Sequence, residues 1–77
     1  MLTAAELRAA WQIACELFLD LEMAGATICD LSQFPYACES VASIDGAGKL
    51  HRYPIRAYGQ FRLAYDENTN MLYLGRA

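Results

Sequence analysis

The side chains of this sequence best suited to nucleophilic or metal chemistry are three cysteines and one histidine. They are Cys15, Cys29, Cys38 and His51. Cysteine catalysis needs a thiolate, a base and a group that orients the base, so Cys38 with His51 is the best pair for an enzyme. Structural zinc needs four organised ligands, and no CxxC pair occurs in the chain. We therefore expect reduced thiols, no metal site and no cofactor.

Other patterns that often carry chemistry have simpler structural explanations here. Glu16 and Asp20 are four residues apart on the polar side of a predicted helix, and Asp66 and Glu67 fall in a predicted turn. Both pairs are in solvated positions, whereas acid–base catalysis needs a pocket that shifts a pKa. Residues 46–49 are glycine-rich but lack the helix N-terminus that binds phosphate. The sequence thus predicts no catalytic residue and a non-enzymatic protein.

Length and composition indicate one small folded domain over residues 1–77. Hydrophobic residues make up 56% of the chain, which is too apolar for a disordered protein. No basic cluster precedes an apolar run at the N-terminus, and no apolar stretch is long enough to span a membrane. We expect a cytoplasmic protein without a membrane partner.

The N-terminal region predicts one long helix. Thr3 and Glu6 have the spacing of a capping box, in which each side chain accepts a hydrogen bond from the other residue's backbone N–H. A helical pattern continues to Ala24, and Gly25 suits the left-handed residue that ends a helix. The largest side chains that this helix should direct into the core are Trp11 and Phe18.

After the helix the hydrophobic period changes to two, which is typical of strands. Strands are predicted over residues 37–44, 49–57, 60–66 and 71–75, with a further short extended segment at 27–29. Pro54 cannot donate a ladder hydrogen bond, so its strand should lie at an edge or carry a bulge. The predicted fold is α+β, with the helix packed on a three- to four-stranded antiparallel β-meander. The other sheet face should be open to solvent or a partner.

Basic and aromatic residues alternate in the second half of the chain and form the main candidate binding site. They are Arg52, Tyr53, Arg56, Tyr58 and Arg62. Arginine and tyrosine dominate the hot spots of protein interfaces. Exposed aromatic and basic residues on a sheet can also bind single-stranded nucleic acid. The net charge of −3 favours a protein partner over nucleic acid.

Two further patches are candidate contact sites. Residues 1–45 carry seven acidic residues and one basic residue, whereas residues 46–77 carry two acidic and five basic residues. An acidic helix face that includes Glu16 and Asp20 could therefore imitate phosphates toward a basic channel. Leu19 and Met23 are apolar residues one turn apart on the polar side of the helix. That pair predicts a contact patch, either with a partner or in a homo-oligomer.

Together these features predict a protein-binding module, most simply a small inhibitor or adaptor that sterically blocks a surface of a larger complex. A phage or mobile-element protein that blocks a host nucleic-acid-handling machine, as anti-CRISPR proteins do, is one concrete version, by analogy of size and character. The partner would be a protein, either alone or within a nucleoprotein complex. The alternatives are a sheet that binds single-stranded nucleic acid and a subunit of a homo-oligomer. The protein itself would be a monomer or homodimer.

Overall fold

The computed structural model describes residues 2–18, 25–34 and 38–77. Its helix, α1 (Ala4–Leu17), begins with the predicted capping box. The Thr3 hydroxyl accepts from the Glu6 amide at 3.1 Å, and Glu6 Oε1 accepts from the Thr3 amide at 3.0 Å. The helix ends earlier than its hydrophobic pattern predicts, because Phe18 leaves helical geometry (φ −108°, ψ 38°) and packs its ring 5.6 Å from that of Tyr65. The rest of the predicted helix, residues 19–24, lies outside the described residues.

An ion pair ties the start of α1 to the last strand. Arg76 donates to both carboxylate oxygens of Glu6, with Nε–Oε2 and Nη2–Oε1 distances of 3.0 and 2.7 Å. These hydrogen bonds, together with the Thr3 backbone N–H, lower the pKa of Glu6 from 4.5 to about 2. The ends of the described chain are thus joined by a two-point, charge-assisted contact.

The Glu6–Arg76 contact predicts the direction in which stability changes with pH. Because the folded-state pKa of Glu6 is lowered, its contribution is present above pH 4.5 and is lost as the pH falls towards about 2. Glu6→Gln keeps a capping-box acceptor but removes the charge. We expect its thermal midpoint to be below that of the wild type at neutral pH and to fall less between those two pH values. Circular dichroism melts across this range would show parallel pH profiles if the expectation is wrong.

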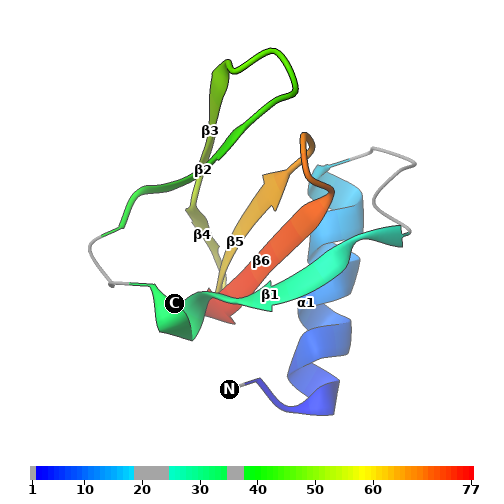
Figure 1. Ribbon diagram of the computed structural model, residues 1–77. Coiled ribbons are helices and arrows are strands. Elements are labelled where there is room, and N and C mark those ends of the chain that lie inside the picture. The colour runs from blue at the N-terminus through cyan, green and yellow to red at the C-terminus, as the bar shows by residue number, and fades with distance from the viewer. Residues whose placement is uncertain (1, 19–24, 35–37) are drawn as a thin grey trace.

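The strands of the described residues form two sheets (Figure 1). The larger sheet has the order β1-β6-β5-β4, with β1 (Thr27–Asp30), β4 (Arg56–Tyr58), β5 (Phe61–Asp66) and β6 (Met71–Arg76). The smaller sheet is a hairpin of β2 (Ser40–Ile44) and β3 (Leu50–Pro54). A 3₁₀ helix, η2 (Leu31–Gln33), follows β1 directly.

The α+β prediction, with one helix against a four-stranded sheet, is confirmed, but the sheet is not a simple meander. β1 runs parallel to its neighbour β6, while the β4–β5 and β5–β6 pairs are antiparallel. The strand predicted over residues 49–57 divides at Ile55. Pro54 has no N–H to continue the ladder, and the Ile55 amide instead donates to the Glu39 carbonyl at 2.9 Å. Beyond Ile55 the chain pairs with β5 instead of β2.

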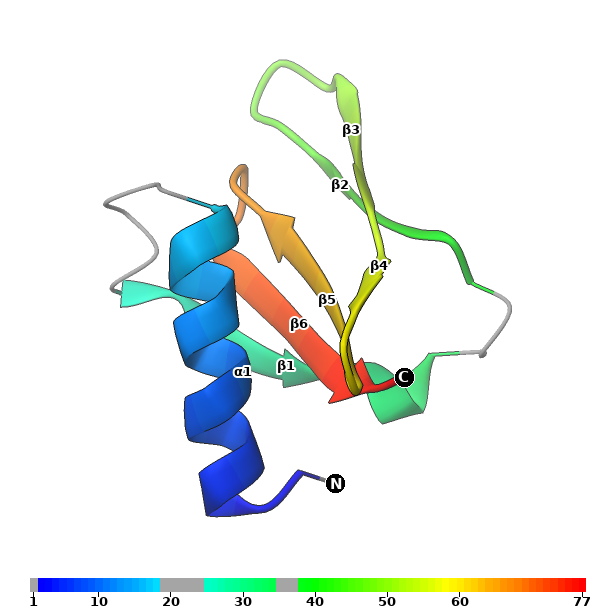
Figure 2. The ribbon, with the colours of Figure 1, turned by 180° about the vertical axis from the view of Figure 1, so that it is seen from behind.

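Hydrophobic residues pack against both faces of the larger sheet. Between α1 and the sheet, the buried residues are Ala10, Ala14, Phe61, Leu63, Tyr65, Leu72 and Leu74. Trp11 and Phe18 pack against this cluster and are partly buried. Figure 2 shows α1 in front of β1 and β6. The opposite face carries a second cluster: Leu31, Val41 and Ala64, flanked by Tyr53, Ile55 and Tyr73.

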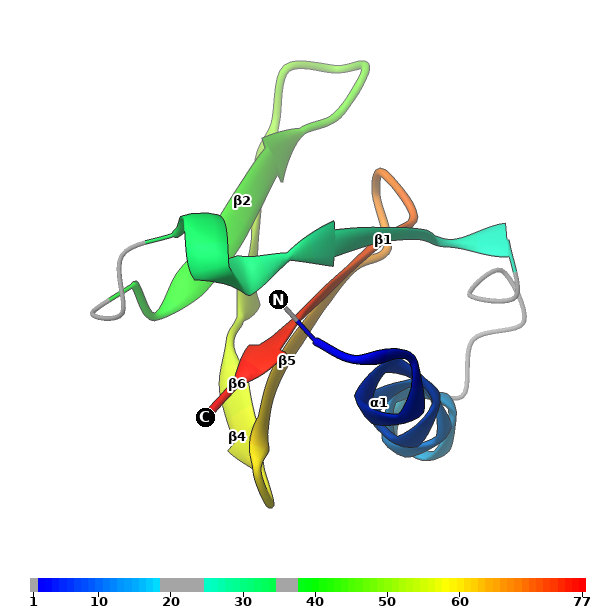
Figure 3. The ribbon, with the colours of Figure 1, turned by 90° about the horizontal axis from the view of Figure 1, so that it is seen from below.

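The second cluster corrects the expectation that this sheet face is open to solvent or a partner. Leu31 of η2 and Val41 of β2 are 0% and 4% exposed. Gly75 of β6 lies so close below η2 that a Cβ there would be 2.8 Å from the Leu31 Cβ. Figure 3 shows the resulting arrangement, with α1 on one side of β5 and β6 and the hairpin on the other. The surface available to a partner must therefore be elsewhere.

Candidate protein-binding surface

The β2–β3 hairpin projects from the molecule on the side away from α1 (Figures 1 and 3). A turn anchored by Asp45 closes it. The Asp45 amide donates to the Lys49 carbonyl at 3.0 Å, and Asp45 Oδ1 accepts from the amides of Ala47 and Lys49 at 2.9 and 3.0 Å. Gly48 has a φ of +83°, which a side chain would disfavour. The turn thus holds the tip of the hairpin in one shape.

His51 contacts the second oxygen of the Asp45 carboxylate. His51 Nε2 lies 2.7 Å from Asp45 Oδ2, and the two side chains are 33% and 27% exposed. This hydrogen bond, followed by that from the Lys49 amide, lowers the pKa of Asp45 below its usual value. The His51 ring also stacks on Tyr53, with centroids 6.5 Å apart. The lone histidine therefore connects the turn of the hairpin to β3.

The candidate enzyme pair is not brought together. The register places Ser43 opposite His51. Ser43 in turn accepts a hydrogen bond from the Asn68 side chain at 2.8 Å. Cys38 lies five residues before Ser43, and its thiol donates to the Ser40 carbonyl at 3.0 Å. Within the described part of the chain, no cluster of histidine, cysteine and carboxylate side chains is arranged to hold a metal ion.

The two faces of the hairpin differ in what covers them. Val41 and Tyr53 are cross-strand partners on the inner face and pack in the second cluster, where burial raises the pKa of Tyr53. On the outer face, Ile44 and Leu50 are cross-strand partners and are 66% and 49% exposed. We call the outer face of residues 40–44 and 50–54 the hairpin face. It presents an uncovered pair of large aliphatic side chains at the projecting end of the molecule.

Positive charge adjoins the aliphatic pair. Arg52 is exposed on the hairpin face opposite Ala42, and Lys49 is exposed in the turn next to Leu50. Asp45, the nearest acidic residue along the chain, is engaged by the turn amides and His51. The hairpin face therefore combines apolar contact area with a basic border, which suits a partner with an acidic rim.

The predicted basic–aromatic residues are split among different surfaces. Arg52 belongs to the hairpin face, whereas Tyr53 is on its inner side. Tyr58 packs with the α1 cluster, and exposed Arg56 is two residues before it on the same strand. Arg62 is on the opposite side of the sheet, paired with Ala57 and Gly75, and its Nε atom is buried. These five residues do not form one platform for stacking bases.

The predicted acidic and apolar helix patches are only partly described. Glu16 is exposed near the end of α1. Asp20, Leu19 and Met23 lie outside the described residues, so their predicted roles stay predictions. Sequence reasoning missed Ile44 and Leu50, although a signal was present. The period of two places apolar residues on both faces of the hairpin, so apolar residues stay exposed on the face that the sheet does not cover.

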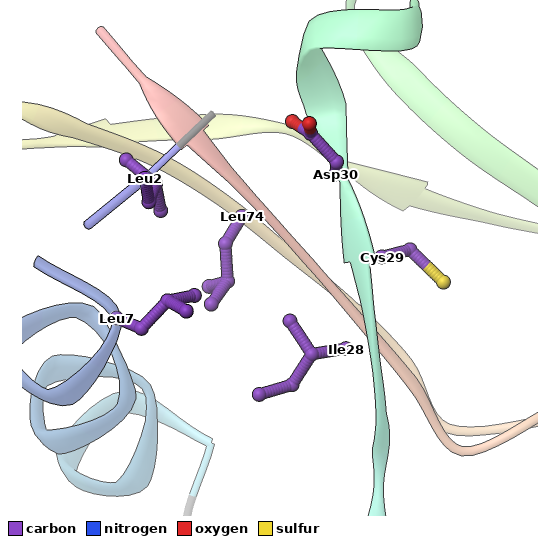
Figure 4. A pocket seen from close by; sticks show the side chains of 6 residues that line it. All are labelled: Leu2, Leu7, Ile28, Cys29, Asp30 and Leu74. Carbon is purple, nitrogen blue, oxygen red and sulfur yellow. The ribbon is translucent and has the colours of Figure 1, made fainter. Parts of the chain in front are cut away.

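An apolar groove lies between α1 and the edge strand β1. One cavity of about 210 Å³ is lined by Leu2, Leu7, Ile28, Cys29, Asp30 and Leu74. Figure 4 shows the four aliphatic side chains pointing toward a shared space, while the Cys29 side chain points away from them. A neighbouring cavity of about 310 Å³ shares Leu7 and Ile28 and extends along α1 to Arg8, Trp11 and Gln12. Ile28 is 47% exposed, so the groove opens to solvent.

Comparisons with known proteins bring no further information about the site. No protein family, characterised protein or solved structure gives a significant match to this chain. The helical part of the described chain holds no segment long and apolar enough to cross a membrane.

Proposed function

We propose that this protein is a non-enzymatic binding module that acts as a small inhibitor or adaptor by covering a surface of a larger protein or nucleoprotein complex. The hairpin face is its principal contact surface. Steric coverage needs no catalytic group, only a rigid projecting element with enough apolar area to anchor it.

The observation that carries this proposal is the exposed pair Ile44 and Leu50. Single exposed aliphatic residues are common, but a cross-strand pair at the tip of a projecting hairpin forms a contiguous apolar patch. Asp45 and His51 order the hairpin before any partner binds. Such preorganisation lowers the entropic cost of binding.

The surrounding charges support a partner with an acidic patch. Arg52 and Lys49 border the aliphatic pair, and complementary charge speeds association and selects the correct partner. Direct binding of single-stranded nucleic acid has less support, because Tyr53 and Tyr58 pack in different hydrophobic clusters. Base stacking needs aromatic faces exposed on one surface.

We further propose that the protein acts in the cytoplasm as a monomer or homodimer. All three cysteines are unpaired, and Cys15 is exposed. A reducing compartment keeps such thiols from forming unwanted disulfides.

Charge reversal at Arg52 tests which charged surface contacts the partner. The protein is immobilised, exposed to a nuclease-treated extract of cells that produce it, and its captured proteins are quantified by mass spectrometry. We expect Arg52→Glu to weaken capture of the partner several-fold, because it places a carboxylate against the acidic rim. Arg56→Glu is the matched control, since Arg56 is also exposed but lies on the α1 side of the sheet.

Glu16→Lys completes the comparison by testing the acidic helix face. We expect it to leave capture unchanged. Loss of the partner with Glu16→Lys but not with Arg52→Glu would transfer the contact to the helix and overturn the proposal. A parallel capture uses extract that was not treated with nuclease. Capture from the untreated extract alone would favour nucleic acid as the ligand.

A further inference from the structure

We infer that the free edge of β1 accepts an extended segment of a partner protein as an added strand, whose side chains fill the groove between α1 and β1. This site is separate from the hairpin face and does not rest on it. Three features of the described residues carry the inference: an unpaired strand edge, an apolar groove beside it, and opposite charges at the two ends of the groove.

The first feature is the backbone of β1. Among the described strands, β1 pairs only with β6, and the Thr27 amide donates to the Asn70 carbonyl at 3.0 Å. Thr27 and Cys29 therefore direct their backbone groups toward β6. In a parallel ladder alternate residues face opposite edges, so Ile28 directs its N–H and C=O outward. An unpaired edge of this kind is a template for another strand.

β1 is short, at four residues, but it lacks the residues that most often block a strand edge. Natural edge strands are commonly blocked by a lysine, a proline or a bulge. β1 has the sequence Thr-Ile-Cys-Asp, with no basic residue and no proline, and its one charged residue, Asp30, is at its end. Ile28, in the middle, is 47% exposed. An added strand would bury this side chain while satisfying its backbone groups.

The second feature is the position of the groove. A strand added to β1 would lie about 4.8 Å beyond it, and every second side chain would point to the α1 side of the sheet. The two cavities that share Leu7 and Ile28 occupy that side, and Trp11 lines the second of them. Their volumes of about 210 and 310 Å³ are several times the ~30 Å³ share of a water molecule. Aliphatic side chains at alternate positions of the incoming segment fit this apolar space.

The third feature is charge, and it defines the chemistry of the segment further. Arg8 lines the groove at the end that runs along α1, and Asp30 lines it at the other end. The Ser32 amide donates to Asp30 at 2.8 Å and lowers the pKa of this carboxyl, which keeps it ionised. The complementary segment therefore alternates apolar residues and carries an acidic residue near Arg8 and a basic residue near Asp30.

The test uses the full chain and a capped probe peptide of about seven residues. The probe alternates valine and threonine and carries glutamate at one end and lysine at the other. Titration is followed by ¹H–¹⁵N NMR. We expect the Ile28 amide to shift downfield and become protected from hydrogen exchange, and the Trp11 indole to shift. No perturbation at Ile28 with the peptide at about 1 mM would overturn the inference.

Backbone methylation separates strand addition from simple side-chain contact. One version of the probe is N-methylated at the amides on one edge of the extended peptide, and a second version at the amides on the other edge. Only the edge that faces β1 donates hydrogen bonds to it, so one version should bind and the other should not. Equal binding of both versions would contradict an added strand, even if the groove were occupied.

Two substitutions in the protein complete the test. Ile28→Asp should weaken probe binding by at least about tenfold, whereas Ile44→Asp, on the separate hairpin face, should not change it. Arg8→Glu should weaken binding of the original probe and strengthen binding of a probe in which lysine replaces the glutamate. Sedimentation should give the same oligomeric state for the wild type alone and for Ile28→Asp. A dimer abolished by Ile28→Asp would identify the occupant as a second copy and overturn the inference.

Discussion

Placing aspartate at both Ile44 and Leu50 should abolish capture of the partner while leaving the protein folded. The two side chains are 66% and 49% exposed, so their loss removes little packing from the free protein. In a complex, the same positions would be desolvated, and two unpaired carboxylates would be buried against the partner. Truncation of one hot-spot residue costs at least ~2 kcal/mol, or about 30-fold in affinity, and the double charge substitution should exceed that.

Leu17→Asp is the control for the double substitution. Leu17 is 41% exposed at the end of α1, away from the hairpin, and its replacement introduces one carboxylate into another exposed aliphatic site. Capture should persist with this variant, and circular dichroism should show an unchanged fold for all variants. Persistent capture by the folded double variant would remove the hairpin face from the interface.

Truncation of Leu31 should lower the stability of the fold strongly. Leu31 of η2 is fully buried in the second cluster, on the face of the larger sheet opposite α1. Its replacement by alanine removes buried methyl groups and leaves a cavity, which lowers the free energy of unfolding by about 2–5 kcal/mol. For a 77-residue domain that is a large part of the total stability.

Urea unfolding of Leu31→Ala would measure this loss, with Leu50→Ala as the control. Leu50 carries the same side chain but is 49% exposed, so its truncation should change stability by no more than about 0.5 kcal/mol. Equal effects of the two substitutions would mean that the second cluster does not cover the sheet. The hairpin would then have no fixed position relative to the rest of the fold.

The features that the sequence predicted correctly are those encoded by short-range interactions. The capping box of Thr3 and Glu6 depends on residues three apart. The turn at residues 45–48, between two of the predicted strands, depends on neighbouring backbone groups. The α+β class followed from the change in hydrophobic period after the helix.

The features that the sequence did not reveal depend on contacts between distant segments. The pairing of β1 with β6 joins residues more than forty positions apart, and nothing local in residues 27–30 specifies a parallel neighbour. Phe18 ends the helix where its ring meets Tyr65, and helix propensity carries no information about that contact.

The candidate site also depends on contacts between distant segments, which local sequence patterns do not reveal. Alternation along β3 placed Arg52 and Tyr53 on opposite faces, but it could not show which face the sheet would cover. That choice depends on η2 and on the break at Ile55, which turns the hairpin over the second cluster. Once the inner face is known, the exposed Ile44 and Leu50 follow from the register.

Photo-crosslinking from the hairpin face provides the most direct test of how this protein acts. Leu50 is replaced by the photoreactive amino acid benzoylphenylalanine, and the same replacement at Leu17 serves as the control. On irradiation in the cells that produce the protein, we expect a discrete adduct with another protein from position 50 and none from position 17. An adduct from position 17 alone, or none from either position, would contradict a function exerted through the hairpin.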